Sequence, residues 1–173
     1  MAQAFARHGD GNAAVDLLRM INPAERTASP ELVRRYRGEP YAVAADVSAA
    51  PGIEGAANWT WYTGSSAWMY RVWIEDVLGF HLRGATLTIR PSIPSHWPGF
   101  RIQYRYGDSL WKIEVERAAT LGAIGIECDG VEVNDQIIVL ADDGRDHTVR
   151  VAIASSDRLD HTVVSGLSLT QDK

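Results

Sequence analysis

The tetrapeptide Thr63-Gly64-Ser65-Ser66 combines small and hydroxyl-bearing side chains without a carboxylate, and it opens an apolar stretch with helical spacing. The N–H groups and the positive dipole end of a helix attract anions, and a glycine allows an oxyanion to approach the backbone closely. Phosphate is therefore one ligand that this segment fits. An ordinary helix cap uses the same residue types, so both interpretations stay open on these residues alone.

The same segment lies in the densest aromatic stretch of the chain, which contains Trp59, Trp61, Tyr62, Trp68 and Tyr70. Tryptophan and tyrosine rings have flat apolar faces and polar edges, which suit a protein core and also the C–H faces of sugars. The composition alone is consistent with both roles.

Two carboxylates, Glu39 and Asp46, fit either a general acid and base pair or local salt bridges and caps, because an irregular segment fixes no distance between them. Arg71 is expected to neutralise Glu75 one helical turn later. The serines at the start of the helix lack the strand–turn–helix setting of a GxSxG nucleophile, so serine-hydrolase chemistry is not predicted. The histidines lie far apart along the chain without ligand spacing, so no metal site is predicted. They are His81, His96, His147 and His161.

The chain has 173 residues, of which 46% are hydrophobic and 23% charged, as is ordinary for a globular protein. Its net charge of −5 and its lack of a basic cluster argue against a nucleic-acid partner. The single cysteine, Cys128, cannot form an intrachain disulfide. The sequence has no long apolar run and does not begin like a secretion signal, so we expect a cytoplasmic location.

The spacing of apolar residues predicts an amphipathic helix over residues 12–20 and a second helix over residues 65–78, with Gly79 at a left-handed cap position. The second helix is apolar over most of its surface, and we expect it to be deeply packed on the rest of this chain or on part of a longer protein. Between the helices, residues 26–63 are rich in proline and glycine and are predicted to form an irregular, functional segment.

After Gly84 the apolar pattern changes to a period of two. In residues 110–116, Trp111 and Ile113 alternate with charged residues, so Trp111 is predicted to face a core rather than a sugar. Many short strands at close spacing indicate an antiparallel β-sandwich. The other strands are predicted at residues 86–89, 101–106, 122–128, 136–140, 148–153 and 162–164.

Three stretches of this sequence occur in the order found in glycoside hydrolase family 94. They are residues 38–47 (GEPYAVAADV), 59–71 (WTWYTGSSAWMYR) and 93–100 (IPSHWPGF). That family contains cellobiose, chitobiose and β-1,2-oligoglucan phosphorylases and the C-terminal region of cyclic β-1,2-glucan synthases. The first two stretches are most similar to the synthase branch. The chain therefore resembles the C-terminal part of a family 94 enzyme.

The resemblance implies an α+β chain in which residues 1–83 form the last helices of an (α/α)6 barrel and residues 84–173 form a C-terminal antiparallel β-sandwich. It also implies an inverting reaction in which phosphate, the co-substrate, attacks the anomeric carbon while one aspartate protonates the glycosidic oxygen. No further cofactor is implied. The general acid of the family lies upstream of the part represented here, so no catalytic residue is expected in this chain.

The family's phosphate-binding Thr-Gly pair matches Thr63 and Gly64, and Ser65 follows them as a third candidate for the phosphate site. A glutamine that reaches phosphate in the phosphorylases falls near Ala45, so the sequence departs from the family pattern at this contact. The candidate sugar-binding residues within the matching stretches are Tyr41, Trp59 and Trp61.

The sequence thus predicts a fragment of a cyclic β-1,2-glucan synthase or a related inverting glycoside phosphorylase acting on β-glucans. The fragment is expected to supply part of a phosphate and sugar pocket and to be inactive alone. Expected partners are a β-glucan oligosaccharide, phosphate, and either the rest of the parent enzyme or a homo-oligomer that covers the helices. A parent synthase would be attached to the inner membrane through upstream segments. The alternative is a stand-alone carbohydrate-binding or interaction module without catalysis.

Overall fold

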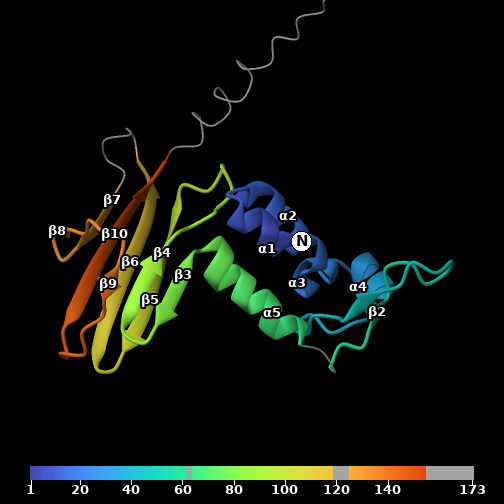
Figure 1. The fold of residues 1–173 in the computed structure, drawn as a ribbon. Helices are drawn as coiled ribbons and strands as arrows, with labels where there is room; N and C mark the ends of the chain where they lie inside the picture. The colour runs from blue at the N-terminus through green and yellow to red at the C-terminus, as the bar shows by residue number, and fades with distance from the viewer. Residues whose placement is uncertain (62–63, 119–124, 155–173) are drawn as a thin grey trace, which may run out of the picture. The chain divides into compact units, whose positions relative to one another are not determined.

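The computed structural model describes residues 1–61, 64–118 and 125–154 and shows an α+β chain (Figure 1). The chain forms two compact units, and each is described by itself. The first unit consists of Met1–Leu82 and Thr88–Pro94, and the second of Arg83–Leu87 and the described residues from Ser95 onward. The domain boundary expected after residue 83 stays a prediction. None of the described helices is long and apolar enough to cross a membrane.

Helices α1 (Ala2–Arg7) and α2 (Gly11–Ile21) open the first unit, and α2 confirms the helix predicted over residues 12–20. The Asp10 side chain caps α2 by accepting a hydrogen bond from the Ala13 amide at 2.9 Å. One face of α2 is buried, and it consists of Gly11, Ala14, Val15 and Leu18.

The helix predicted over residues 65–78 forms as α5 (Ser65–Arg71) followed by the π-helical segment η1 (Val72–Val77). Gly79 follows with φ +69°, in the left-handed conformation expected for a cap. The buried residues of η1 are Val72, Asp76 and Val77.

Within the described residues the first half of this helix is not deeply packed, so its packing on part of a longer protein stays a prediction. No residue of α5 is buried, and Trp68 keeps 59% of its surface exposed. An apolar side chain is buried only where a neighbouring element covers it, and no described element covers most of Trp68. The Arg71 guanidinium lies over the Trp68 ring, 5.9 Å from its centroid.

The buried carboxylate of Asp76 holds helix α1 against η1. Arg7 Nε donates to Asp76 Oδ1 at 2.7 Å, and Gln3 Nε2 donates to Asp76 Oδ2 at 2.9 Å. Both carboxylate oxygens therefore have partners, which a charge removed from water requires. The contacts join residues that lie 69 and 73 positions apart in the sequence.

Helices α3 (Pro23–Arg26) and α4 (Pro30–Tyr36) correct the prediction that residues 26–63 are irregular throughout. Ser29 caps α4 through its hydroxyl, and proline occupies the first helical position, where no N–H donor is needed. The helix ends at Arg37, which adopts the left-handed conformation with φ +56°. The Ser-Pro-Glu sequence at residues 29–31 is the local signal for this helix.

The second unit contains a five-stranded sheet in the order β5-β6-β10-β7-β8 (Figure 1). Strands predicted at residues 101–106, 110–116 and 148–153 are confirmed, and residues 122–124 and 162–164 lie outside the described part. The strands are β5 (Gly99–Tyr106), β6 (Ser109–Arg117), β7 (Gly125–Cys128), β8 (Val131–Glu132) and β10 (Asp146–Ile153).

This sheet is mixed rather than antiparallel. Strands β5 and β6 pair antiparallel, but β6 and β10 pair parallel, with Ile113 opposite Val149. The prediction of an antiparallel arrangement is therefore wrong for the β6–β10 pair. A parallel pair needs a long connection between its strands, and residues 118–145 provide it.

A three-stranded sheet has the order β3-β4-β9, with β3 at Phe80–Arg83, β4 at Thr86–Ile89 and β9 at Ile138–Val139. Strand β4 confirms the strand predicted at residues 86–89. Strand β9 is shorter than the strand predicted at residues 136–140.

Alternation along β6 places Trp111 in the core of the second unit, as predicted, with 2% of its surface exposed. Its indole Nε1 donates to the Ala141 carbonyl at 3.3 Å, so the polar edge of the ring has a partner. This tryptophan is therefore a core residue and not a sugar-binding one. Other buried side chains of the unit are Leu87, Ile113, Val115, Ile138, Leu140, Val149 and Val151.

Replacing Gly79 with alanine should destabilise the first unit more than the same change at Gly9. Both glycines have positive φ, which costs a side chain about 1–2 kcal/mol. A Cβ at Gly79 would also lie 2.1 Å from the Arg90 carbonyl, whereas nothing lies within 4 Å of a Cβ at Gly9. Urea unfolding followed by the helical circular dichroism signal compares the two variants. Equal losses of stability would show that the contact with Arg90 is not tight.

Candidate functional site

Two short strands bring separate parts of the first unit together beside helix α5. Strands β1 (Asp46–Val47) and β2 (Ala57–Asn58) pair antiparallel. Next to this pair, the Ala45 amide donates a hydrogen bond to the Trp59 carbonyl at 3.3 Å. Backbone pairing therefore places the first and second of the three family-like stretches side by side.

The start of α5 is tied to the same segments. The Val43 amide donates to Ser66 Oγ at 3.4 Å, and within the first turn of the helix the Trp68 amide donates to the Gly64 carbonyl at 3.0 Å. Thr63 lies outside the described residues, so its part in the phosphate site stays a prediction, as do those of Gly64 and Ser65.

Gly64 leaves open space beside its backbone at the N-cap of α5. Its φ of −79° is accessible to any residue, and nothing lies within 4 Å of the place where a Cβ would be. The backbone conformation therefore does not require a glycine here. An oxyanion could approach this position closely because no side chain occupies it.

The candidate sugar-binding aromatics are exposed, and two of them contact each other. Tyr41 and Trp61 are 71% and 68% exposed, and their rings meet edge to face at 5.9 Å between centroids. The Trp61 indole Nε1 donates to Glu39 Oε1 at 2.8 Å, which fixes the orientation of the ring. Trp59 is 70% exposed and has a left-handed backbone with φ +51°. The structure thus brings Tyr41, Trp61 and Glu39 together.

The carboxylates Glu39 and Asp46 serve local hydrogen bonds. The Thr60 hydroxyl, the backbone amide of Glu39 and the Trp61 indole hold the pKa of Glu39 below its ordinary value. A general acid needs the opposite shift, because it must hold a proton near neutral pH. Asp46 Oδ2 accepts a hydrogen bond from Asn58 Nδ2 at 3.4 Å. These hydrogen bonds favour a local structural role over an acid and base pair, although none of them is a salt bridge or a helix cap.

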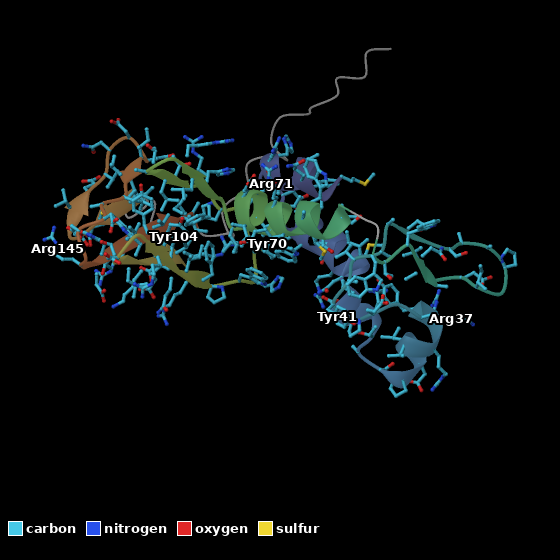
Figure 2. All side chains as sticks on the ribbon, turned by 90° about the horizontal axis from the view of Figure 1, so that it is seen from below. Arg37, Tyr41, Tyr70, Arg71, Tyr104 and Arg145 are labelled. Carbon is cyan, nitrogen blue, oxygen red and sulfur yellow. The ribbon has the colours of Figure 1, made fainter. Side chains whose placement is uncertain are left out.

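Helix α5 presents charged and aromatic side chains outside the candidate phosphate site. Arg71 pairs with Glu75 at 2.9 Å, one helical turn away, as the sequence predicts. Tyr70 is 67% exposed beside it. Figure 2 shows Tyr70 and Arg71 on α5 and Tyr41 in the segment that follows helix α4.

A cavity of about 620 Å³ lies within the first unit and is lined mainly by apolar side chains of α1, α2, α5 and residues 43–47. Ser65, a predicted phosphate contact, lines this cavity. Ala45, where the sequence departs from the family pattern, lines the same cavity. The apolar residues that line it and remain exposed are Met1, Met20, Ile21, Val47 and Trp68.

Two polar residues of this cavity were not predicted from the sequence. Arg26 lines the cavity, and its buried Nε has no hydrogen-bond partner among the described residues. Tyr36 is 3% exposed, and burial raises the pKa of its phenol while the Ala44 amide and the charge of Arg26 oppose this shift. The Ser-Pro start indicates helix α4, but no local signal distinguishes the buried Tyr36 from Leu32 and Val33, which are not buried.

Comparison with known proteins agrees with the family resemblance, and the matched family region contains the first two of the three sequence stretches. Residues 1–79 match the family described as glycosyl hydrolase 94 superfamily, catalytic domain. The chain is 40% identical over 119 residues to cyclic beta-(1,2)-glucan synthase NdvB of Rhizobium meliloti (strain 1021), a match that covers 69% of this chain and 4% of the synthase.

Two phosphorylases are also similar. N,N'-diacetylchitobiose phosphorylase of Vibrio proteolyticus is 27% identical over 153 residues, which cover 87% of this chain and 19% of that protein. Solabiose phosphorylase of Paenibacillus borealis is 31% identical over 147 residues, which cover 83% of this chain and 19% of that protein. These matches span at most a fifth of the relatives' length. Through residues 1–79, the chain belongs to the catalytic domain of the glycosyl hydrolase 94 superfamily.

Proposed function

We propose that this chain supplies part of the phosphate and sugar pocket of a larger cyclic β-1,2-glucan synthase or related inverting glycoside phosphorylase, and that it does not catalyse a reaction alone. The observation that carries the proposal is the meeting of residues 39–47, 57–61 and 64–66. This region presents exposed aromatic rings beside an open helix start, within a sequence similar to such enzymes.

In this proposal, phosphate binds at the start of α5 through Thr63, Gly64 and Ser65. The positive end of the helix favours an anion there, and the open space at Gly64 admits an oxygen close to the backbone. Ala45 cannot donate the side-chain hydrogen bond that a glutamine would, so this part of the site holds phosphate through fewer contacts. In the parent enzyme, a phosphate oxygen forms the new bond to the anomeric carbon as the glycosidic bond breaks. An aspartate outside this chain gives its proton to the leaving oxygen.

The sugar is held by Tyr41, Trp59 and Trp61, whose exposed rings offer faces for the C–H groups of a β-glucan. Glu39 orients the Trp61 ring through its indole N–H. An oriented ring loses less conformational freedom on binding, which favours this pair as a preformed sugar contact.

The first unit then represents the last helices of an (α/α)6 barrel, and the second unit the C-terminal β-sandwich. The apolar cavity and the exposed Trp68 are covered by the rest of the parent enzyme, because an exposed apolar patch usually marks an interface. Arg26 Nε has no acceptor within the part of the chain that the structure describes, which favours a covering segment that brings one to it. In the isolated chain, the same surface would promote a homo-oligomer.

The alternative function is a stand-alone carbohydrate-binding module. The exposure of Tyr41, Trp59 and Trp61 favours it, since all three rings are accessible without another chain. The two functions differ in whether phosphate binds as well as sugar.

Replacing Gly64 with alanine should weaken phosphate binding without changing the fold. The backbone angles and the open space at this position accept a methyl group, but that group would lie where the oxyanion approaches. Titration calorimetry with inorganic phosphate should show a several-fold higher Kd for Gly64→Ala and for Thr63→Ala than for the unchanged chain. Gly125→Ala, also in open space, is the matched control. Unaltered affinity in both variants would contradict the phosphate site.

Replacing Trp61 with alanine should weaken binding of short β-1,2-gluco-oligosaccharides about two- to tenfold, the range that corresponds to one aromatic contact. The change removes one ring of the Tyr41 pair and the hydrogen bond to Glu39. Tyr70→Ala, which removes an exposed ring elsewhere in the unit, is the control and should retain the original affinity. The sugar site would be excluded if the two variants bound the oligosaccharide equally well.

A further inference from the structure

His147 is a buried histidine near the start of strand β10, in the second unit. It lies opposite Trp111 in the parallel pair with β6, and 6% of its surface is exposed. The imidazole stacks on the Trp111 indole with 4.2 Å between ring centroids and 18° between their planes. This histidine is therefore held between the core and one end of the five-stranded sheet.

Both ring nitrogens of His147 face carboxylates. Nδ1 lies 2.7 Å from Asp129 Oδ2, and Nε2 lies 3.1 Å from Asp143 Oδ1. A neutral imidazole has one N–H group, and an ionised carboxylate can only accept. A neutral ring would therefore place one nitrogen lone pair against a carboxylate oxygen. Two N–H groups satisfy both contacts.

Each carboxylate is fixed by further donors that stabilise its charge. The Thr148 amide donates to Asp129 Oδ1 at 2.8 Å, and the Ser109 hydroxyl donates to Asp143 Oδ1 at 3.1 Å. The Arg145 guanidinium pairs with Asp143 Oδ2. These contacts keep both carboxylates ionised, so the protons required by the geometry belong on the imidazole.

The cluster of His147, Asp129 and Asp143 joins two turns to strands β6 and β10. Asp129 belongs to the turn between β7 and β8, and it adopts a left-handed backbone with φ +49° that its side-chain contacts help to hold. Asp143 precedes β10, where the Asp143 and Gly144 amides donate to the buried Ser109 hydroxyl of β6 at 2.9 and 3.0 Å. Figure 2 shows Arg145 at this end of the second unit.

We propose that His147 is an imidazolium clamp that fastens the turns at residues 129–130 and 142–145 to strands β6 and β10, and that loss of its proton loosens this end of the sheet. The other charged groups nearby are already paired. Lys112 binds the neighbouring Asp146 at 2.7 Å, and the Asp142 carboxylate accepts the Asp108 amide at 2.7 Å. The two carboxylates that face the ring are therefore its direct electrostatic partners among the described residues.

The direction of the pH dependence follows from the same contacts. The hydrogen bond to Asp129 raises the pKa of His147 above its ordinary 6.5, burial opposes this, and Asp143 raises the pKa further. The clamp is therefore complete below pH 6.5 and is lost as pH rises through the folded-state value. His147, mainly through its hydrogen bond, and the Thr148 amide lower the pKa of Asp129, so that carboxylate becomes protonated only below its ordinary range.

The protonation state can be read directly from the ring nitrogens of the unmodified chain by ¹⁵N NMR. Below pH 6.5 we expect both nitrogens of His147 to carry protons, and we expect the titration midpoint to lie above 6.5. A titration midpoint at or below 6.5, with a neutral ring that carries one protonated and one bare nitrogen below that pH, would overturn the proposal. This measurement needs no variant and does not depend on the phosphate or sugar site.

The clamping role is tested by hydrogen exchange at pH 6 in His147→Gln, with the exposed His96→Gln as the matched control. We expect exchange of the Asp129, Gly144 and Thr148 amides to be at least several-fold faster in His147→Gln and unchanged in His96→Gln. The unmodified chain should show the same local increase when pH is raised through the His147 midpoint, after correction for intrinsic exchange. Equal protection of these amides in the charged and neutral states would contradict the clamp, even if His147→Gln failed to fold.

Discussion

The close approach between the end of η1 and residues 90–92 is the constraint on which the candidate site depends. The Arg90 amide donates to the Gly79 carbonyl at 2.9 Å, and the Ser92 amide donates to the Val77 carbonyl at 2.8 Å. A Cβ at Gly79 would lie 2.1 Å from the Arg90 carbonyl, so only a glycine fits without a backbone shift. This junction fixes the end of the helix that begins at Ser65, and a functional site is precise only when its supporting elements are rigid.

The site itself is assembled mostly by backbone hydrogen bonds. The Val43 and Ala45 amides bind Ser66 Oγ and the Trp59 carbonyl, so the shape of the region depends little on the side chain at residue 45. A glutamine contact can therefore be lost there without loss of geometry. The result is an open helix start beside exposed aromatic rings, in a chain similar to short parts of much longer enzymes, and we propose that this region is part of a pocket.

Features determined by local sequence could be predicted, and features determined by distant partners could not. The alternation around Trp111 and the cap at Gly79 are local, and the structure has both. The exposure of Trp68 depends on which surface covers α5, and the edge contact of Tyr41 with Trp61 depends on the path of the intervening chain. Apolar composition and residue spacing predict neither which surface covers a helix nor which distant side chains meet. The helix at residues 30–36 differs, because its Ser-Pro start is a local signal that the proline and glycine content of the surrounding segment obscured.

The central claim is that this chain holds ligands of a glycoside phosphorylase or synthase without performing the reaction. The most direct measurement is ³¹P NMR of inorganic phosphate mixed with the purified chain and a β-1,2-gluco-oligosaccharide. The account predicts a broadened or shifted phosphate signal and no signal from a sugar 1-phosphate, because we propose that the acid that protonates the leaving oxygen lies outside this chain. Accumulation of a sugar 1-phosphate would contradict the account, since the chain would then contain a complete catalytic site.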